Sequence, residues 1–308
     1  MSGKEKTINI VMAADNNYSS WMGILIMSII KNTPCKVYFH IIDGGITEQN
    51  RKRIEFLGSS STTQFNWYRP DHNNYTGFPI KRYGIATYYR LSMASILPES
   101  LETIIYLDCD MLAVDDLPVL ANILDDGQVL AAVEDISAPR TEIGFEQHEY
   151  FNAGTLVIDM KLWRKNDYEE KLLKLMQERG DELKYLDQDA LNIVFRNQWQ
   201  KIPLQWNFQP GIWRRAEKKQ YGPEGTTRAD YEHALKNPAI IHFLARRKPW
   251  IYGCIHPLKK VYLEYLKQSP WSELYPRPNS PREVVQYYSG IDKLFKQQKR
   301  WLQMKKFL

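Results

Sequence analysis

The stretch TIIYLDCD, from Thr103 to Asp110, places an apolar, β-branched run directly before two aspartates that are two residues apart. The run predicts a buried strand that ends at Leu107. Carboxylates at positions i and i+2 of an extended chain point the same way, so Asp108 and Asp110 repel each other unless a positive charge lies between them. A solvated acidic turn and a divalent-metal site both explain the pair. Such a pair arises about once by chance in a chain of this length. It therefore indicates a metal site only if further ligand residues occur elsewhere in the sequence.

The segments around this strand alternate between apolar strands and amphipathic helices, as in a doubly wound sheet. We predict strands at 8–14, 36–42, 64–68, 102–107, 129–133, 154–158 and 239–243, and helices at 18–31, 47–57, 87–97, 161–179, 186–197 and 258–266. The predicted fold class is α/β, with a Rossmann-like nucleotide-binding sheet in a single large domain at 1–270. Residues 271–308 are expected to form a linker rich in Pro and Ser and a small helical tail.

The composition is that of a globular protein, with 44% hydrophobic and 25% charged residues among 308. We expect no signal peptide and no membrane-spanning helix. Cys35, Cys109 and Cys254 predict no disulfide framework and favour a cytoplasmic location. Residues 281–308 hold seven basic and two acidic side chains, so they account for the whole net charge of +5. Since the rest of the chain is neutral, we expect no nucleic-acid partner.

Polar clusters follow several of the predicted strands. Ligands of such sheets bind outside the carboxyl ends of the strands. Asp15 follows the first strand, Asp108 and Asp110 follow the fourth, and His242 lies in a late one. Five clusters occur in order along the chain: AADNNY at 13–18, YLDCD at 106–110, FNAG at 151–154, YLDQDALN at 185–192 and HFLARRKPW at 242–250.

In content and order, these five clusters resemble glycosyltransferase family 8, the retaining GT-A enzymes that use UDP-sugars. Within that family, the bacterial lipooligosaccharide and lipopolysaccharide α-glycosyltransferases are the most similar. The resemblance covers the chain from the first predicted strand to Trp250. It implies a GT-A fold and the transfer of galactose or glucose from a UDP-hexose donor. The implied acceptor is a glycan, such as a cell-surface lipo-oligosaccharide or a glycolipid.

The resemblance implies a metal site made by Asp108, Asp110 and His242. Two carboxylates and one imidazole favour Mn²⁺ over Mg²⁺, because Mg²⁺ prefers oxygen ligands. Mg²⁺ is the alternative. The ion would stabilise the charge that develops on the departing diphosphate. Lys248 would be a second cation on that diphosphate. Taken alone, His242 is more often a hydrogen-bonded core histidine.

The resemblance also implies the residues that bind the donor. Tyr18 would stack on uracil and Asp15 would accept a hydrogen bond from the base, although polar residues before a helix also act as N-caps. Arg90 would contact the sugar or a phosphate. The small residues of the FNAG cluster would let the backbone approach the sugar. The implied set is Ala13, Asp15, Asn17, Tyr18, Arg90, Asp108, Asn152, Ala153, Gly154, Ala245 and Lys248. The family usually has Gly at the place of Ala245.

The segment Asp187–Asp189 is implied to lie at the reacting carbon. Asp187 would bind sugar hydroxyls and Gln188 would lie near the anomeric carbon. An amide is a poor nucleophile, which favours attack on the same face as departure over a double displacement. Asp189 is the alternative nucleophile. Taken alone, the segment is more often an acidic helix N-terminus, which the helix dipole favours.

The basic tail at 281–308 resembles the membrane-attachment tail of these relatives. Its apolar residues fall in an arc of about 140° on a helix, as in an interfacial anchor on anionic lipid. We therefore expect peripheral association with the inner face of the plasma membrane, with packing on the body or on another subunit as the alternative. Two other functions stay open: a metal-dependent sugar-phosphate nucleotidyltransferase, although AADNNYSS is no Gly-rich basic loop, and a non-catalytic UDP-sugar-binding protein at the membrane.

Overall fold

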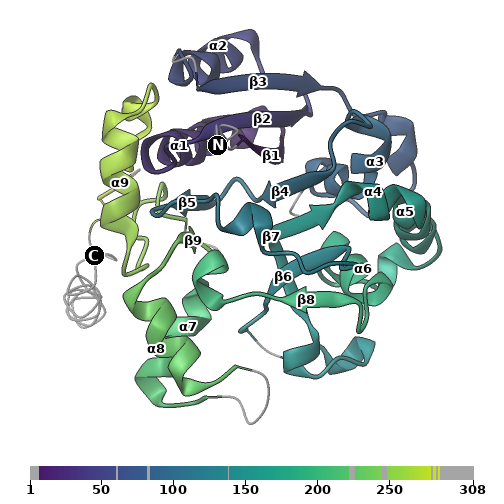
Figure 1. Cartoon of the computed structure of the whole chain (residues 1–308). Coiled ribbons are helices and arrows are strands. Elements are labelled where there is room, and N and C mark those ends of the chain that lie inside the picture. The colour runs from purple at the N-terminus through teal and green to yellow at the C-terminus, as the bar shows by residue number, and fades with distance from the viewer. Residues whose placement is uncertain are drawn as a thin grey trace, which may run out of the picture.

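The computed structural model describes residues 7–59, 62–81, 84–137, 139–221, 226–244, 248–278, 280, 281 and 284. Its centre is a seven-stranded sheet with the order β3-β2-β1-β4-β7-β6-β8, accompanied by a two-stranded sheet of β5 and β9 (Figure 1). Helices pack on both faces of the large sheet, so the predicted α/β class is confirmed. No helix in the described part of the chain is long and apolar enough to cross a bilayer.

The strands match the predicted ones, with two short additions. Strands β3, β2, β1 and β4 are parallel, as in a nucleotide-binding half-sheet, and β7 runs antiparallel beside β4. The unpredicted strands, β5 and β8, have three residues each, too few to show a period of two. The bounds are Thr7–Ala14 (β1), Lys36–Asp43 (β2), Thr63–Tyr68 (β3), Thr103–Leu107 (β4), Met111–Ala113 (β5), Leu130–Glu134 (β6), Phe151–Asp159 (β7), Trp199–Lys201 (β8) and Ile240–His242 (β9).

The helices differ more from the predicted ones. The expected long helix at 161–179 breaks into α4 and α5, because Asp167 has a φ of 52°, which a short polar side chain tolerates. Thr47 is the N-cap of α2, as predicted. Helices α7 and α8 were not predicted. The bounds are Asn16–Asn32 (α1), Glu48–Leu57 (α2), Met93–Ile96 (α3), Met160–Lys165 (α4), Tyr168–Arg179 (α5), Asp187–Val194 (α6), Pro210–Lys218 (α7), Arg228–Lys236 (α8) and Lys259–Gln268 (α9).

The helix expected at 87–97 is mainly a 3₁₀ helix, Ile85–Ser92, which is followed by the single turn of α3. In a 3₁₀ helix, side chains three residues apart are aligned on one side. Thr87 and Arg90 therefore point the same way, and both reach Asp187 at the start of α6. An α-helix would offset these two side chains by about 60° around its axis.

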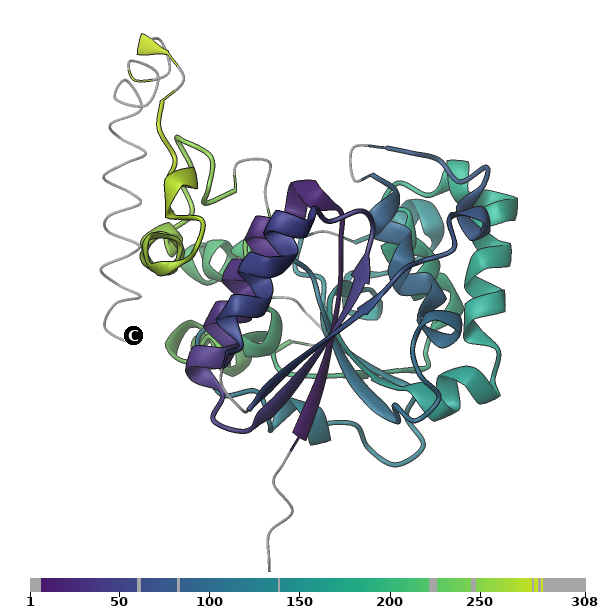
Figure 2. The ribbon, with the colours of Figure 1, turned by 90° about the horizontal axis from the view of Figure 1, so that it is seen from above.

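Two hydrophobic cores lie on opposite faces of the sheet. One packs α1, α2, α8 and α9, and the other packs the 3₁₀ helix at 85–92 with α4, α5 and α6. Figure 2 shows the strands edge-on between these two groups of helices. The strand ends between the cores are left free to carry polar side chains.

The domain extends past residue 270. Trp271 is 1% exposed, its ring packs on Gly23 of α1, and its Nε1–H donates to Oδ1 of Asn50 at 3.0 Å. An ion pair of 2.7 Å between Arg53 and Glu273 continues the contact. The predicted linker therefore begins too early, because an aromatic anchor follows the Pro that suggested it. The helical tail lies outside the described residues.

Trp271→Ala is expected to lower the free energy of unfolding by about 3–5 kcal/mol, the usual cost of removing a fully buried Trp. Urea denaturation followed by circular dichroism measures this change. Phe56→Ala is the control, since Phe56 is 72% exposed on α2 and its loss should cost under about 0.5 kcal/mol. A loss below about 1 kcal/mol for Trp271→Ala would show that residues after 270 are dispensable to the core.

Candidate active site

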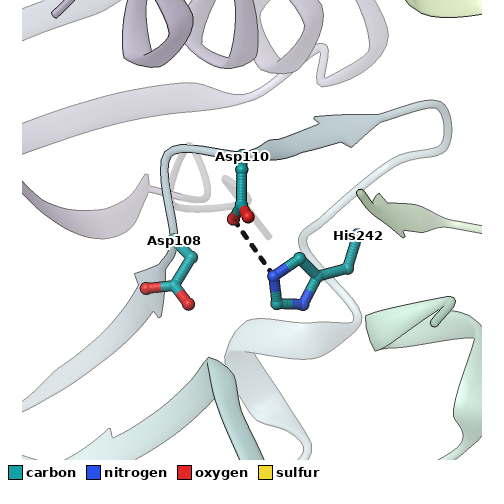
Figure 3. A group of neighbouring side chains, drawn as sticks. All are labelled: Asp108, Asp110 and His242. Atoms are coloured by element: carbon teal, nitrogen blue, oxygen red, sulfur yellow. Dashed lines mark ion pairs between the residues drawn. The ribbon is translucent and has the colours of Figure 1, made fainter. Parts of the chain in front are cut away.

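Asp108, Asp110 and His242 meet just beyond β4 (Figure 3). The two aspartates follow β4, and the small ladder of β5 with β9 pairs Met111 with His242. Phe243 N–H donates to the carbonyl of Asp110 at 3.0 Å and extends this ladder to the acidic pair. One ligand atom from each of the three side chains lies within 4.8 Å of the others. Strand pairing thus places His242, which is distant in the sequence, beside the two aspartates.

The donor set fits a divalent transition metal. Nε2 of His242 lies 3.0 Å from Oδ1 of Asp110, but the alignment is too poor for a hydrogen bond, and this buried nitrogen has no hydrogen-bond partner among the described residues. A buried polar atom left without a partner costs free energy, which a bound cation would recover. Two carboxylates and an imidazole nitrogen are ligands that suit Mn²⁺.

Two cations flank the acidic pair. Lys248 Nζ lies 2.5 Å from Oδ2 of Asp110, and Arg90 Nη2 lies 2.6 Å from Oδ1 of Asp108. Burial raises the pKa of Asp110, but the positive charge of Lys248 opposes it, and that pKa lies well below its usual value. Burial lowers the pKa of Lys248, whereas Asp110 raises it by more. Both partners are therefore charged.

Arg90 connects the metal site with the start of α6. It is 7% exposed, so it is not a surface arginine, and it lies over the ring of Tyr106. Its Nη1 donates to the carbonyl of Ala153 at 2.8 Å, and its Nε lies 3.0 Å from Oδ2 of Asp187. Burial raises the pKa of Asp187 to about 6, although Arg90 and the hydroxyl of Thr87 lower it.

Gln188 is the one partly exposed residue of the segment Asp187–Asp189. Its Oε1 accepts from the backbone N–H of Ala153 at 3.1 Å, and its Nε2 donates to Asp135 at 3.1 Å and to the Tyr150 hydroxyl at 3.2 Å. The amide is thereby oriented. Leu186, just before the segment, has a φ of 47°, a conformation that costs free energy in a non-glycine residue.

Asp189 does not suit the role of a nucleophile. The side chain is fully buried, and its two oxygens accept from Arg140, from the Tyr150 hydroxyl and from the N–H of Tyr185. With its lone pairs engaged in this way, the carboxylate has no open side toward a sugar. We correct its role to one of supporting Tyr150, which contacts Gln188.

The FNAG cluster lies on β7, and Gly154 has a role different from the expected one. A Cβ at Gly154 would lie 2.4 Å from Cε1 of His242 and 2.6 Å from Cε of Met111. The missing side chain therefore makes room for the imidazole rather than for a sugar. The carbonyl of Gly154 also accepts from the N–H of Asp108 at 2.9 Å.

The predicted nucleotide-binding residues lie at the end of β1. Asp15 is the N-cap of α1, where its Oδ1 accepts from the N–H groups of Asn17 at 2.9 Å and Tyr18 at 3.2 Å. Tyr18 is 41% exposed, so its ring is available for stacking. Ala13 O lies 3.4 Å from Sγ of Cys109, which is buried as expected and joins this end to the acidic pair. Ala245 lies outside the described residues.

Sequence reasoning missed two residues of the site, Asn207 and Tyr150, and assigned no role to Thr87. Thr87 lies three positions before Arg90, so a 3₁₀ prediction would have found it. Asn207 Oδ1 lies 2.9 Å from Nδ1 of His242, yet no motif surrounds Asn207, so only the fold reveals this contact.

A family model described as "Glycosyl transferase family 8" matches residues 9–254 of the chain. The chain belongs to glycosyltransferase family 8. General stress protein A of Bacillus subtilis is 31% identical over 284 residues, which are 88% of this chain and 97% of that protein. The lipopolysaccharide 1,2-glucosyltransferase of Escherichia coli K12 is 26% identical over 280 residues, which are 88% of this chain and 80% of that protein.

Solved structures agree with this membership. The galactosyltransferase LgtC, crystallised with donor and acceptor sugar analogues, is 26% identical with a TM-score of 0.75, and the match covers 91% of this chain and 100% of that one. The predicted GT-A fold is confirmed by this similarity. Nothing in these matches supports the nucleotidyltransferase alternative for this family 8 glycosyltransferase.

Proposed function

We propose that this glycosyltransferase is a Mn²⁺-dependent, retaining hexosyltransferase that moves galactose or glucose from a UDP-hexose to a lipopolysaccharide-type glycan or a glycolipid. The observation that carries the proposal is the meeting of Asp108, Asp110 and His242 between the cations Lys248 and Arg90. The relatives support the substrate class, since they include a lipopolysaccharide 1,2-glucosyltransferase and a lipopolysaccharide 1,3-galactosyltransferase.

Asp108, Asp110 and His242 would hold the ion, which supplies Lewis-acid stabilisation of the diphosphate when bound. Lys248 Nζ lies 2.5 Å from Oδ2 of Asp110. The ammonium is therefore at the metal site, where it would contact a phosphate oxygen of the donor. Tyr18, Asp15 and Asn17 at the end of β1 would receive the uracil. Together these groups would bind the UDP part of the donor, which is the leaving group of the reaction.

Asp187 and Arg90 would bind hydroxyls of the donor sugar, because their polar atoms meet beside the acidic pair. Gln188 presents an amide oxygen, which can stabilise an oxocarbenium-like sugar but is a poor nucleophile. Since Asp189 is fully engaged by Arg140 and Tyr150, we favour attack on the face from which UDP departs. The departing diphosphate would then accept the proton of the acceptor hydroxyl.

Release of UDP from a panel of UDP-sugars, measured with Mn²⁺ and with EDTA and without acceptor, tests this function. We expect slow release from UDP-galactose or UDP-glucose that depends on Mn²⁺. Equal release in EDTA would contradict the metal dependence. If UDP binds but no sugar nucleotide is hydrolysed, even when glycan acceptors are added, the non-catalytic alternative is favoured.

We also propose that the protein is cytoplasmic and that its basic tail binds the anionic inner face of the plasma membrane. Ending the chain after Pro278 retains Trp271 and Glu273 and removes the tail. We expect this truncation to weaken sedimentation with anionic liposomes while UDP-sugar hydrolysis is unchanged. Liposomes of neutral lipid are the control. Unchanged binding to anionic liposomes would reject the membrane role.

A further inference from the structure

We propose that Asn207 is a positioning residue for the metal site, because its side-chain amide sets the tautomer of His242 so that Nε2 presents a lone pair toward Asp110. This inference rests on the proposed metal-dependent function. No part of the FNAG or HFLARRKPW clusters contains Asn207. The contact with His242 arises from the fold alone.

Backbone hydrogen bonds bring Asn207 to His242. Asn207 ends a 3₁₀ turn, Leu204–Asn207, and the next residue forms an isolated parallel bridge with Ile241 of β9. Phe208 N–H donates to the carbonyl of Ile240 at 2.7 Å, and His242 N–H donates to the carbonyl of Phe208 at 3.1 Å. Asn207 is fully buried at this point. The segment thus acts as a third strand beside β9 and holds the amide against the imidazole.

His242, Asn207 and Asn152 form a relay of hydrogen-bonded side chains. A backbone group determines the direction of these hydrogen bonds. The N–H of Gly154 can only donate, and it donates to Oδ1 of Asn152 at 3.0 Å. The Asn207 atom 2.8 Å from that oxygen must therefore be Nδ2, which leaves Oδ1 of Asn207 facing Nδ1 of His242 at 2.9 Å. An oxygen at this place requires a proton on Nδ1, so the neutral ring keeps Nε2 unprotonated.

The same relay continues to the reacting end of the site. Nδ2 of Asn152 donates to Oδ2 of Asp135 at 3.3 Å, and that oxygen also accepts from Nε2 of Gln188 at 3.1 Å. Asn152, Asn207 and Asp135 are at most 5% exposed, so solvent does not compete for these bonds. The orientation of Gln188 and the tautomer of His242 are therefore linked by one buried chain of two asparagine amides and the Asp135 carboxylate.

The first test measures Mn²⁺ affinity from the electron paramagnetic resonance signal of free Mn²⁺, with UDP present. Asn207→Leu removes both hydrogen bonds at similar volume, and we expect about 10–100-fold weaker Mn²⁺ binding. Asn207→Asp keeps an oxygen against Nδ1, and we expect it to bind Mn²⁺ more tightly than Asn207→Leu. Wild-type affinity in Asn207→Leu would overturn the inference.

Asn192→Leu is the matched control. Asn192 is 1% exposed and bonds to the backbone of Phe151 and Gln188, so its replacement also removes a buried, hydrogen-bonded amide but does not touch His242. We expect unchanged Mn²⁺ affinity. An equal loss in both Leu variants would assign the effect to general disruption of the core and would also overturn the inference.

A measurement on the unmodified protein keeps the test independent of how the variants fold. Nitrogen NMR of histidine-labelled protein, without metal and at about pH 8, reports which ring nitrogen of His242 carries the proton. We expect Nδ1 protonated and Nε2 unprotonated, and the opposite tautomer would overturn the inference. Failure of the wild-type protein to bind Mn²⁺ would count against the proposed function instead, since the tautomer is read without metal.

Discussion

Asp110→Asn is expected to weaken Mn²⁺-dependent UDP binding by at least about 100-fold, the upper end of what loss of support to a metal ligand costs. Asp110 is the one acid of the site that contacts both His242 and Lys248. Asparagine keeps the shape but removes the charge that attracts the ion and pairs with Lys248. Titration calorimetry of UDP in Mn²⁺ and in EDTA measures the effect.

The control for this substitution is Asp126→Asn, at an exposed position outside the metal group, which should bind UDP as the wild type does. A folded Asp110→Asn protein that binds UDP in Mn²⁺ with full affinity would remove Asp110 from the ligand set. Binding that is equally weak with and without Mn²⁺ is the expected pattern.

Gly154→Ala is expected to reduce both Mn²⁺ affinity and UDP-sugar hydrolysis by about 100-fold, although only one methyl group is added. The new Cβ would lie 2.4 Å from Cε1 and 2.8 Å from Nδ1 of His242, and Nδ1 is the nitrogen that Asn207 contacts. The imidazole must therefore leave its position beside Asp110. Overpacking should also cost about 1–3 kcal/mol of stability. Mn²⁺ titration and thermal unfolding measure the two effects separately.

Gly180→Ala serves as the comparison for Gly154→Ala. A Cβ at Gly180 would meet Cε of Met176 and Cδ of Pro79 at 3.0 Å, away from the polar site, and the Met side chain can move. We expect it to keep Mn²⁺ affinity and hydrolysis. Full Mn²⁺ affinity in a folded Gly154→Ala protein would show that His242 does not need the space left by the missing side chain of Gly154.

Much of the site was predictable because its residues follow strands that local patterns reveal. Asp108 and Asp110 end an apolar run, and Asp15 directly follows another. The 3₁₀ geometry at Thr87 and Arg90 was not predictable, since the same spacing also suits an α-helix. The break at Asp167 was missed for a similar reason, because the helical pattern continues through it.

The sequence by itself determined the α/β class, the acidic pair at the end of β4 and the family, since these depend on spacings of two to four residues and on the order of motifs. Only the tertiary structure decided that Arg140 and Tyr150 occupy the hydrogen-bonding positions of Asp189. It also decided that Trp271 belongs to the core. The positioning of His242 by Gly154 and Asn207 was likewise visible only in the fold. These contacts join segments far apart in the chain. They are made by strand pairing and side-chain packing, which no local pattern of residues encodes.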